Sequence, residues 1–84
     1  MDIHLEIISP EKTLFQGKVN LIRVPGTQGN FAVLQYHAPI ISTLEKGQIQ
    51  IEERKGTPQY FDIEGGILEV RKNMAVILVE EPQY

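Results

Sequence analysis

Apolar and polar residues alternate along most of this chain, and this period of two constrains the fold more than any other feature. Ile3, Leu5 and Ile7 alternate with polar side chains, and residues 48–52 read glutamine-isoleucine-glutamine-isoleucine-glutamate. Successive side chains of a strand point to opposite faces, so the pattern predicts half-buried β-strands. No stretch shows the 3.6-residue period of an amphipathic helix. The fold is therefore expected to be all-β.

Turn signals divide the chain into short strands. We expect strands over residues 3–7, 19–24, 31–34, 40–44, 48–52, 59–63, 67–70 and 74–79. Turns are expected at residues 9–10, 16–18, 25–29, 46–47, 54–58, 65–66 and 71–73, most of which contain proline or glycine. Short strands with a turn about every 8–12 residues are typical of a sandwich or barrel. The prediction is a single domain over residues 1–84, an antiparallel two-sheet β-sandwich or flattened barrel.

Size and charge exclude several classes of protein. The chain has 84 residues, no cysteine and a net charge of −3, with eight basic residues against eleven acidic ones. A nucleic-acid binder needs surplus positive charge, so nucleic acid is not an expected partner. No apolar run approaches the roughly 18–20 residues that span a bilayer, and the N-terminus lacks the features of a signal peptide. We expect a soluble protein of a reducing compartment, without disulfides or direct membrane insertion.

The residues that perform catalysis or bind metals are not arranged for either task. Ser9 and Ser42 are the two serines, and neither lies in a nucleophile elbow. His4 and His37 are far apart in the sequence and lack a metal-binding spacing. We expect no catalytic residue, no cofactor and no metal, and a small β module that binds something.

The strongest loop signal is the segment 25–29, which contains Pro25 and the Gly26-x-x-Gly29 spacing. Some RNA-binding modules use this spacing to clamp a nucleic-acid backbone, but they place it between helices on a basic surface. Two interpretations stay open for it here. Its glycines shape a turn and do nothing else, or the loop contacts a partner, as loops on a rigid scaffold often do.

Several segments together resemble the epsilon subunit of F-type ATP synthases. The opening of that family is similar to residues 5–17, and its next motif to residues 23–31. His37-Ala38-Pro39 followed by two isoleucines matches the family's histidine-alanine-proline segment, and Gly65-Gly66 with the residues up to Leu78 matches its late glycine-glycine motif and last strand. The order and spacing of these motifs over residues 3–79 carry the resemblance.

The resemblance implies a β-sandwich of roughly ten short strands and a non-catalytic subunit of the central rotor. Such a subunit sits at the foot of the gamma subunit, against the polar loops of the membrane c-ring, and couples rotation of the ring to gamma. The implied partners are gamma, the c-ring and the rest of the ATP synthase complex. The implied location is peripheral, on the cytoplasmic face of the cell inner membrane. A melting temperature raised by bound gamma is expected, because a partner that binds only the folded state stabilises it.

The resemblance also assigns contact residues. The family's c-ring contact falls on Gln28, Gly29, Asn30 and Phe31, and its gamma contact falls on Ser9, Tyr36, His37, Ala38, Pro39, Ile41 and Ser42. The family often has an acidic residue where Asn30 stands, so a neutral hydrogen bond is expected to replace an ionic contact. For His37, the alternative to an interface role is bracing of the loop before Pro39.

Two departures from the family pattern stand out. Gln35-Tyr36 replaces a proline-glycine pair, which removes a glycine from the loop and adds an aromatic side chain, an effective interface anchor. Core packing is the alternative role for Tyr36. The family usually continues into a C-terminal helical hairpin, whereas this sequence ends at Tyr84. The expectation is a short form that assembles and couples but neither inhibits ATP hydrolysis nor binds ATP through a hairpin.

Two other functions compete with the rotor. A carbohydrate- or small-ligand-binding sandwich needs exposed aromatics on one face, and the chain has only three tyrosines, three phenylalanines and no tryptophan. An enzyme needs an acid/base pair, but the adjacent glutamates at 52–53 and 80–81 should point to opposite faces of their strands.

Overall fold

The computed structural model describes residues 2–54 and 56–82, and these form strands and turns only. The nine strands are β1 (Ile3–Ile8), β2 (Thr13–Val19), β3 (Leu21–Gly26), β4 (Gly29–Leu34), β5 (Ile40–Leu44), β6 (Gly47–Glu52), β7 (Gln59–Ile63), β8 (Gly65–Arg71) and β9 (Met74–Glu80). The prediction of an all-β fold is confirmed. The described residues of the predicted 1–84 domain exclude Met1, Lys55, Gln83 and Tyr84.

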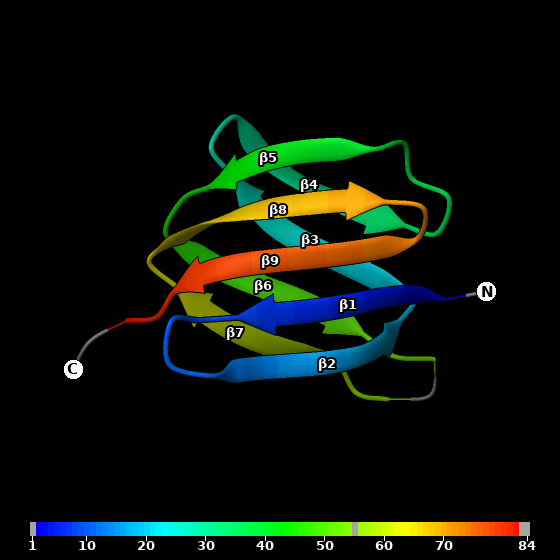
Figure 1. Cartoon of the computed structure of the whole chain (residues 1–84), viewed down its shortest axis with the longest axis horizontal. Helices are drawn as coiled ribbons and strands as arrows, with labels where there is room; N and C mark the ends of the chain where they lie inside the picture. Colours follow the sequence, from blue (N-terminus) through cyan, green and yellow to red (C-terminus); the bar gives the residue numbers. More distant parts are fainter. Residues whose placement is uncertain (1, 55, 83–84) are drawn as a thin grey trace.

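The strands lie in two layers of one curled sheet (Figure 1). The front layer has the order β2-β1-β9-β8-β5, and the back layer contains β4, β3, β6 and β7. A single pair, Gly26 with Leu44, joins β3 to β5 and so joins the layers. The predicted two-sheet sandwich is confirmed, but the prediction of a purely antiparallel arrangement is wrong for one pair. β1 and β9 are parallel, from His4 beside Met74 to Ile8 beside Leu78.

Two glycine signals proved misleading because glycine also occurs within strands, for example beside a bulky side chain or where another backbone approaches closely. Residues 16–18 were predicted to be a turn, yet Gly17 lies within β2 opposite Leu5. Gly66 lies within β8, where a Cβ atom would come within 2.5 Å of the Leu78 carbonyl oxygen. The predicted strand 19–24 is likewise divided at Asn20, between β2 and β3.

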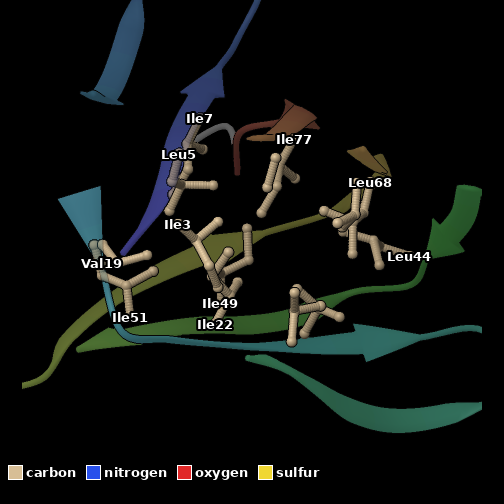
Figure 2. Close-up of a cluster of buried hydrophobic side chains, with 14 of the residues drawn as sticks. Ile3, Leu5, Ile7, Val19, Ile22, Leu44, Ile49, Ile51, Leu68 and Ile77 are labelled. Carbon is tan, nitrogen blue, oxygen red and sulfur yellow. The ribbon is translucent and has the colours of Figure 1, made fainter. Parts of the chain in front are cut away.

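The core lies between the layers and follows the predicted alternation. Figure 2 shows Ile3, Leu5 and Ile7 of β1 reaching toward the isoleucines of the back layer, and all of these side chains are buried. The apolar residues on the inner faces form one cluster: Ile3, Leu5, Ile7, Val19, Ile22, Val24, Val33, Leu44, Ile49, Ile51, Ile63, Leu68, Val70, Ala75, Ile77 and Val79. One continuous cluster of this kind makes the two layers a single stiff body.

The lower edge of the sandwich is closed by an aromatic pair. Phe15 of β2 and Phe61 of β7 meet edge to face, with ring centroids 6.3 Å apart. Both pack against the core from the front and back layers respectively.

Candidate functional site

The described residues contain no grouping suited to metal chemistry. Within residues 2–54 and 56–82, no three histidine or acidic side chains converge as metal ligands. Across the same ranges, no helix has the length and apolar character that a bilayer span requires.

The predicted c-ring contact forms the tip of the β3–β4 hairpin. Thr27 and Gln28 make a two-residue turn between Gly26 and Gly29, and Gly29 has a φ of 122°. The tip is tied to β5: the Thr27 amide donates to the Thr43 carbonyl at 3.0 Å, and the two threonine hydroxyls are 2.7 Å apart. These bonds hold the tip in one position, which makes it suited to a defined contact.

The four predicted tip residues differ in accessibility. Gln28, Gly29 and Asn30 are exposed, and a Cβ atom on Gly29 would meet nothing within 4 Å. Phe31 is half-buried and packs against the core. The first three therefore remain available to a partner, whereas Phe31 supports the tip from beneath.

Gly26 permits this packing, so Gly26→Ala is expected to destabilise the domain. The added methyl would lie 2.7 Å from the Gly29 carbonyl oxygen and 2.9 Å from the Phe31 ring. Overpacking of this kind costs typically about 1–3 kcal/mol. Urea unfolding of the two chains measures the loss, and Gly56→Ala is the control, because a Cβ atom there would lie 3.5 Å from the nearest atom, the Glu53 Cβ, an ordinary contact. A Gly26→Ala chain as stable as the wild type would contradict the proposed close packing.

A groove beside the tip brings the two predicted contact sets together. It has a volume of about 450 Å³ and is lined by residues 26–31 and 40–43. Ile41 and Ser42, which were assigned to a gamma contact, thus lie beside residues assigned to a c-ring contact. The sequence could not show this, because the Gly26–Leu44 pair and the Thr27–Thr43 bonds set the approach of β5.

The loop of residues 35–39 lies at the opposite end of β5 from the tip (Figure 1). Tyr36 is 66% exposed, so the alternative that it packs in the core is wrong. Its φ is 63°, so the backbone conformation that glycine usually supplies is kept without glycine. The left-handed conformation costs a non-glycine residue roughly 1–2 kcal/mol. The loop therefore presents an exposed aromatic ring on a residue whose backbone is strained.

His37 is half-buried and takes part in bracing the same loop. Its backbone amide donates to the Leu34 carbonyl at 3.1 Å, and its Nδ1 lies 2.7 Å from the Ala38 carbonyl oxygen. Such a distance to a carbonyl indicates that Nδ1 carries a proton and donates. Ala38 and Pro39 are exposed next to it. The bracing role predicted as the alternative is thus visible, and the Nε2 side stays available to a partner.

The two serines assigned to the gamma contact point away from solvent to different degrees. Ser9 is 4% exposed, and its hydroxyl bonds the Lys12 carbonyl and accepts from the Lys12 amide, each at 3.2 Å. Ser9 therefore closes the β1–β2 turn. Ser42 is half-buried, and its hydroxyl donates to the Thr43 carbonyl at 3.2 Å. Neither serine offers a free side chain as it stands.

An apolar surface covers the outer face of the front layer, and we call it the outer patch. It comprises Ile8, Ile41, Ile67, Met74, Val76 and Leu78, each of which points away from the core. Ile8, Leu78 and Ile67 stand side by side across β1, β9 and β8. Ile41 is 73% exposed and lies on β5 at the edge of the patch.

The sequence contained a signal for the outer patch that the prediction left unused. Residues 74–79 are apolar almost throughout, whereas a strand with one wet face should alternate. Ala75, Ile77 and Val79 face the core, which leaves Met74, Val76 and Leu78 on the outside. A strand that is apolar on both faces indicates that its outer face is an interaction surface.

The family model described as ATP synthase, Delta/Epsilon chain, beta-sandwich domain, matches residues 2–82. This chain belongs to that family. It is 37% identical over 78 residues to the ATP synthase epsilon chain of Caulobacter vibrioides, covering 93% of this chain and 90% of that protein. It is 38% identical over 77 residues to that of Chlorobaculum tepidum, covering 92% and 88% respectively. The resemblance noted from the motifs is confirmed.

Some of the similar proteins extend beyond the matched region. The epsilon chain of Nitrosococcus oceani is 30% identical over 83 residues, which are 99% of this chain and 59% of that protein. A chain of the Euglena gracilis mitochondrial ATP synthase has the same fold, with a TM-score of 0.90 at 23% identity over 95% of this chain and 51% of its own. A chain from the central stalk and c-ring structure of the Tetrahymena thermophila enzyme gives a TM-score of 0.80 at 17% identity, over 96% and 65% respectively.

Proposed function

We propose that this domain is a non-catalytic subunit of an ATP synthase rotor, which joins the gamma subunit to the c-ring and couples ion translocation to ATP synthesis. It would act peripherally, on the cytoplasmic face of the inner membrane. Family membership supports the proposal, as does the fold shared with a chain of a central stalk and c-ring structure. The observation that carries it is the outer patch, which gives a small domain a large apolar surface to cover.

The outer patch is the proposed gamma-binding surface. Exposed side chains of its size, gathered on one face, mark an interaction site. Two carboxylates accompany the patch: Glu6 flanks Val76 on β1, and Glu69 stands between Val76 and Ile41. The apolar centre is the row of Ile8, Leu78 and Ile67, and charged groups beside an apolar centre are common at stable interfaces. The loop of residues 35–39, with Tyr36, His37, Ala38 and Pro39, is the second part of the proposed gamma contact, and the Tyr36 amide is bonded to Asn73 next to the patch.

The tip is the proposed c-ring-binding surface. Gln28, Gly29 and Asn30 present amides and exposed backbone without a formal charge. Contacts there would be neutral hydrogen bonds, because Asn30 stands where the family often has an acidic residue. The tip and the outer patch are linked through β5, since Ile41 belongs to the patch and also lines the groove beside the tip. A load applied at the tip is thus passed directly to the gamma-binding face.

The sandwich suits this mechanical task because its core resists deformation. Torque passes through non-covalent contacts, and a close-packed interior of cross-braced strands transmits strain with little compliance. The hydroxyl and amide bonds between Thr27 and Thr43 extend that stiffness to the tip. The domain needs no chemistry of its own for this role.

Cysteine crosslinking in the assembled enzyme tests the proposal. The chain contains no cysteine, so each variant carries a single reactive site. Cysteine at Gln28 or Asn30 should crosslink to the c-ring, and cysteine at Ile41 or Leu78 should crosslink to gamma. Tyr60→Cys is the control, since Tyr60 is 57% exposed on the back layer. Absence of both products, with the subunit present in the complex, would overturn the proposal.

The same reconstituted enzyme tests the role in regulation. Adding the 84-residue chain to an enzyme depleted of its epsilon subunit should restore coupling and leave ATP hydrolysis uninhibited, because the proposed contacts lie on the rotor and not in the catalytic head. Strong inhibition of hydrolysis would contradict this part of the proposal.

A ligand-binding function has one observation in its favour. Tyr60 and Arg23 line a hollow of about 520 Å³ on the back layer, together with the amides of Gln48 and Gln50. Among the described residues, Tyr60 is the one largely exposed aromatic of that layer. A single ring offers a sugar one stacking surface, so the rotor proposal is better supported. Retention of the chain on a carbohydrate column would favour this alternative.

A further inference from the structure

Asn73 lies where three segments of the chain meet. It is the second residue of the tight β8–β9 turn, in which Lys72 and Asn73 have φ values of 52° and 59°. Its carbonyl oxygen accepts from the His4 amide at 2.9 Å, which fixes the beginning of β1. Its side-chain Oδ1 accepts from the Tyr36 amide at 2.6 Å. One residue thus joins β1, the β8–β9 turn and the loop of residues 35–39.

The bond to Tyr36 meets a specific need of that loop. Tyr36 has a φ of 63°, a conformation that side chains disfavour, and it is exposed, so packing does little to hold it. The neighbouring bond from the His37 amide to the Leu34 carbonyl fixes the turn but not the Tyr36 amide itself. A strained conformation persists only where its surroundings impose it, and such places are often functional.

We propose that Asn73 is a positioning residue for the gamma contact, which holds the backbone of Tyr36 in the conformation that presents its exposed ring to gamma. This inference rests on the proposed function. Asn73 directly precedes Met74, the patch residue nearest this end of β9, so the side chain of Asn73 ties the loop to the patch itself. The amide acts through Tyr36 and needs no contact with gamma.

Two substitutions separate this role from a general effect on folding. Asn73→Gly removes the amide but keeps the positive φ, which glycine adopts readily, and it keeps the carbonyl that binds His4. Asn73→Asp keeps an oxygen acceptor at the same place and also tolerates the left-handed region. Asn73→Gly should therefore lose the bond to Tyr36 without opening the turn, and Asn73→Asp should retain it.

The first measurement is amide hydrogen exchange of Tyr36 in the isolated chain, with the melting temperature recorded alongside. Loss of one hydrogen bond should speed exchange at Tyr36 at least about fivefold in Asn73→Gly. The His4 amide should keep its protection in both variants, because its acceptor is the backbone. Unchanged Tyr36 exchange in Asn73→Gly would overturn the positioning role, and this result does not depend on any partner.

The second measurement is the affinity of each variant for purified gamma. Asn73→Gly should bind about tenfold more weakly than the wild type, because the competent loop conformation becomes a smaller fraction of the population. Asn73→Asp should stay within about threefold of the wild type, as expected when the acceptor is kept. Equal binding by all three chains would overturn the inference and leave the proposed function intact. Wild-type chain that fails to bind gamma would overturn both, whatever the exchange rates show.

Discussion

Leu78→Glu is expected to abolish binding to gamma while the domain stays folded. Leu78 is 52% exposed at the middle of the outer patch, between Ile8 of β1 and Ile67 of β8. When the complex forms, a carboxylate at this position would be buried without a partner. The cost is on the order of several kcal/mol. Affinity should fall by a factor of at least about 100, since each 1.4 kcal/mol is tenfold. Isothermal titration of gamma into each variant measures the loss.

The matched control for Leu78→Glu is Tyr60→Glu. Tyr60 has a similar exposure, 57%, and lies on β7 in the back layer. The Tyr60→Glu substitution introduces the same charge into the same fold, so it reports any effect of net charge or of expression level. Tyr60→Glu should bind gamma as the wild type does, and both variants should melt within a few degrees of it. Equal loss of binding by both variants, or by neither, would argue against the outer patch as the interface.

The fold was predictable where one face of a strand is wet and the other is dry. Ile49 and Ile51 alternate with polar residues, and both are buried in β6 as predicted. The prediction failed at Gly17 and Gly66, which were assigned to turns. At Gly66 the glycine is needed because the Leu78 backbone lies against it from the neighbouring strand, and a contact between distant segments leaves no local signal in the sequence. At Gly17 the nearest group is the ring of Phe15, two residues earlier on the same strand.

The candidate site was less predictable than the fold, for the same reason. Replacement of the family's glycine by Tyr36 was expected to remove a backbone conformation that glycine permits. Tyr36 nevertheless has a positive φ, and its amide is bonded to Asn73. That partner is far along the sequence, and nothing near Tyr36 indicates it. Ser9 was assigned to an interface from its position in a motif, whereas burial and the bonds to Lys12 explain why serine suits a turn there.

The outer patch shows how a family resemblance and a physical argument can reach one surface by different routes. The resemblance assigned Ile41 and residues 36–39 to gamma, and Ile41 belongs to the patch, while the loop is bonded to Asn73 beside the patch residue Met74. The patch itself follows from burial alone, since the core needs only one face of β9. Its residues Leu78, Ile67 and Met74 were not among those assigned, and they add exposed apolar side chains on the face to which Ile41 belongs.

Ile22→Ala and Ile41→Ala make the same chemical change, one in the core and the other on the outer patch. We expect the first to reduce stability and the second to reduce binding to gamma. Ile22 is fully buried in β3 between Val33 of β4 and Ile51 of β6. Truncation of such a side chain costs about 2–5 kcal/mol, which is comparable to the whole stability of a domain this small, a few kcal/mol. Isolated Ile22→Ala chain should therefore be largely unfolded at room temperature.

Binding should restore much of what Ile22→Ala loses. A partner present at 100 times its dissociation constant adds about 2.7 kcal/mol to the stability of the folded state. Circular dichroism melts with and without excess gamma should show a folded Ile22→Ala complex and a higher melting temperature for the wild-type complex too. Should Ile22→Ala fail to fold under any condition, Ile22→Val, with a cost of about 0.5–1.5 kcal/mol, gives the same comparison on a smaller scale.

Ile41→Ala should behave in the reverse way, because its side chain is 73% exposed and contributes little to the core. Its melting temperature alone should match that of the wild type, while the increase produced by gamma should shrink as affinity falls. Ile22 would then contribute mainly to the stability of the fold, and Ile41 mainly to binding. Equal destabilisation by both substitutions in the isolated chain would mean that the outer patch stabilises the fold itself, and the domain would then not present that face to a partner.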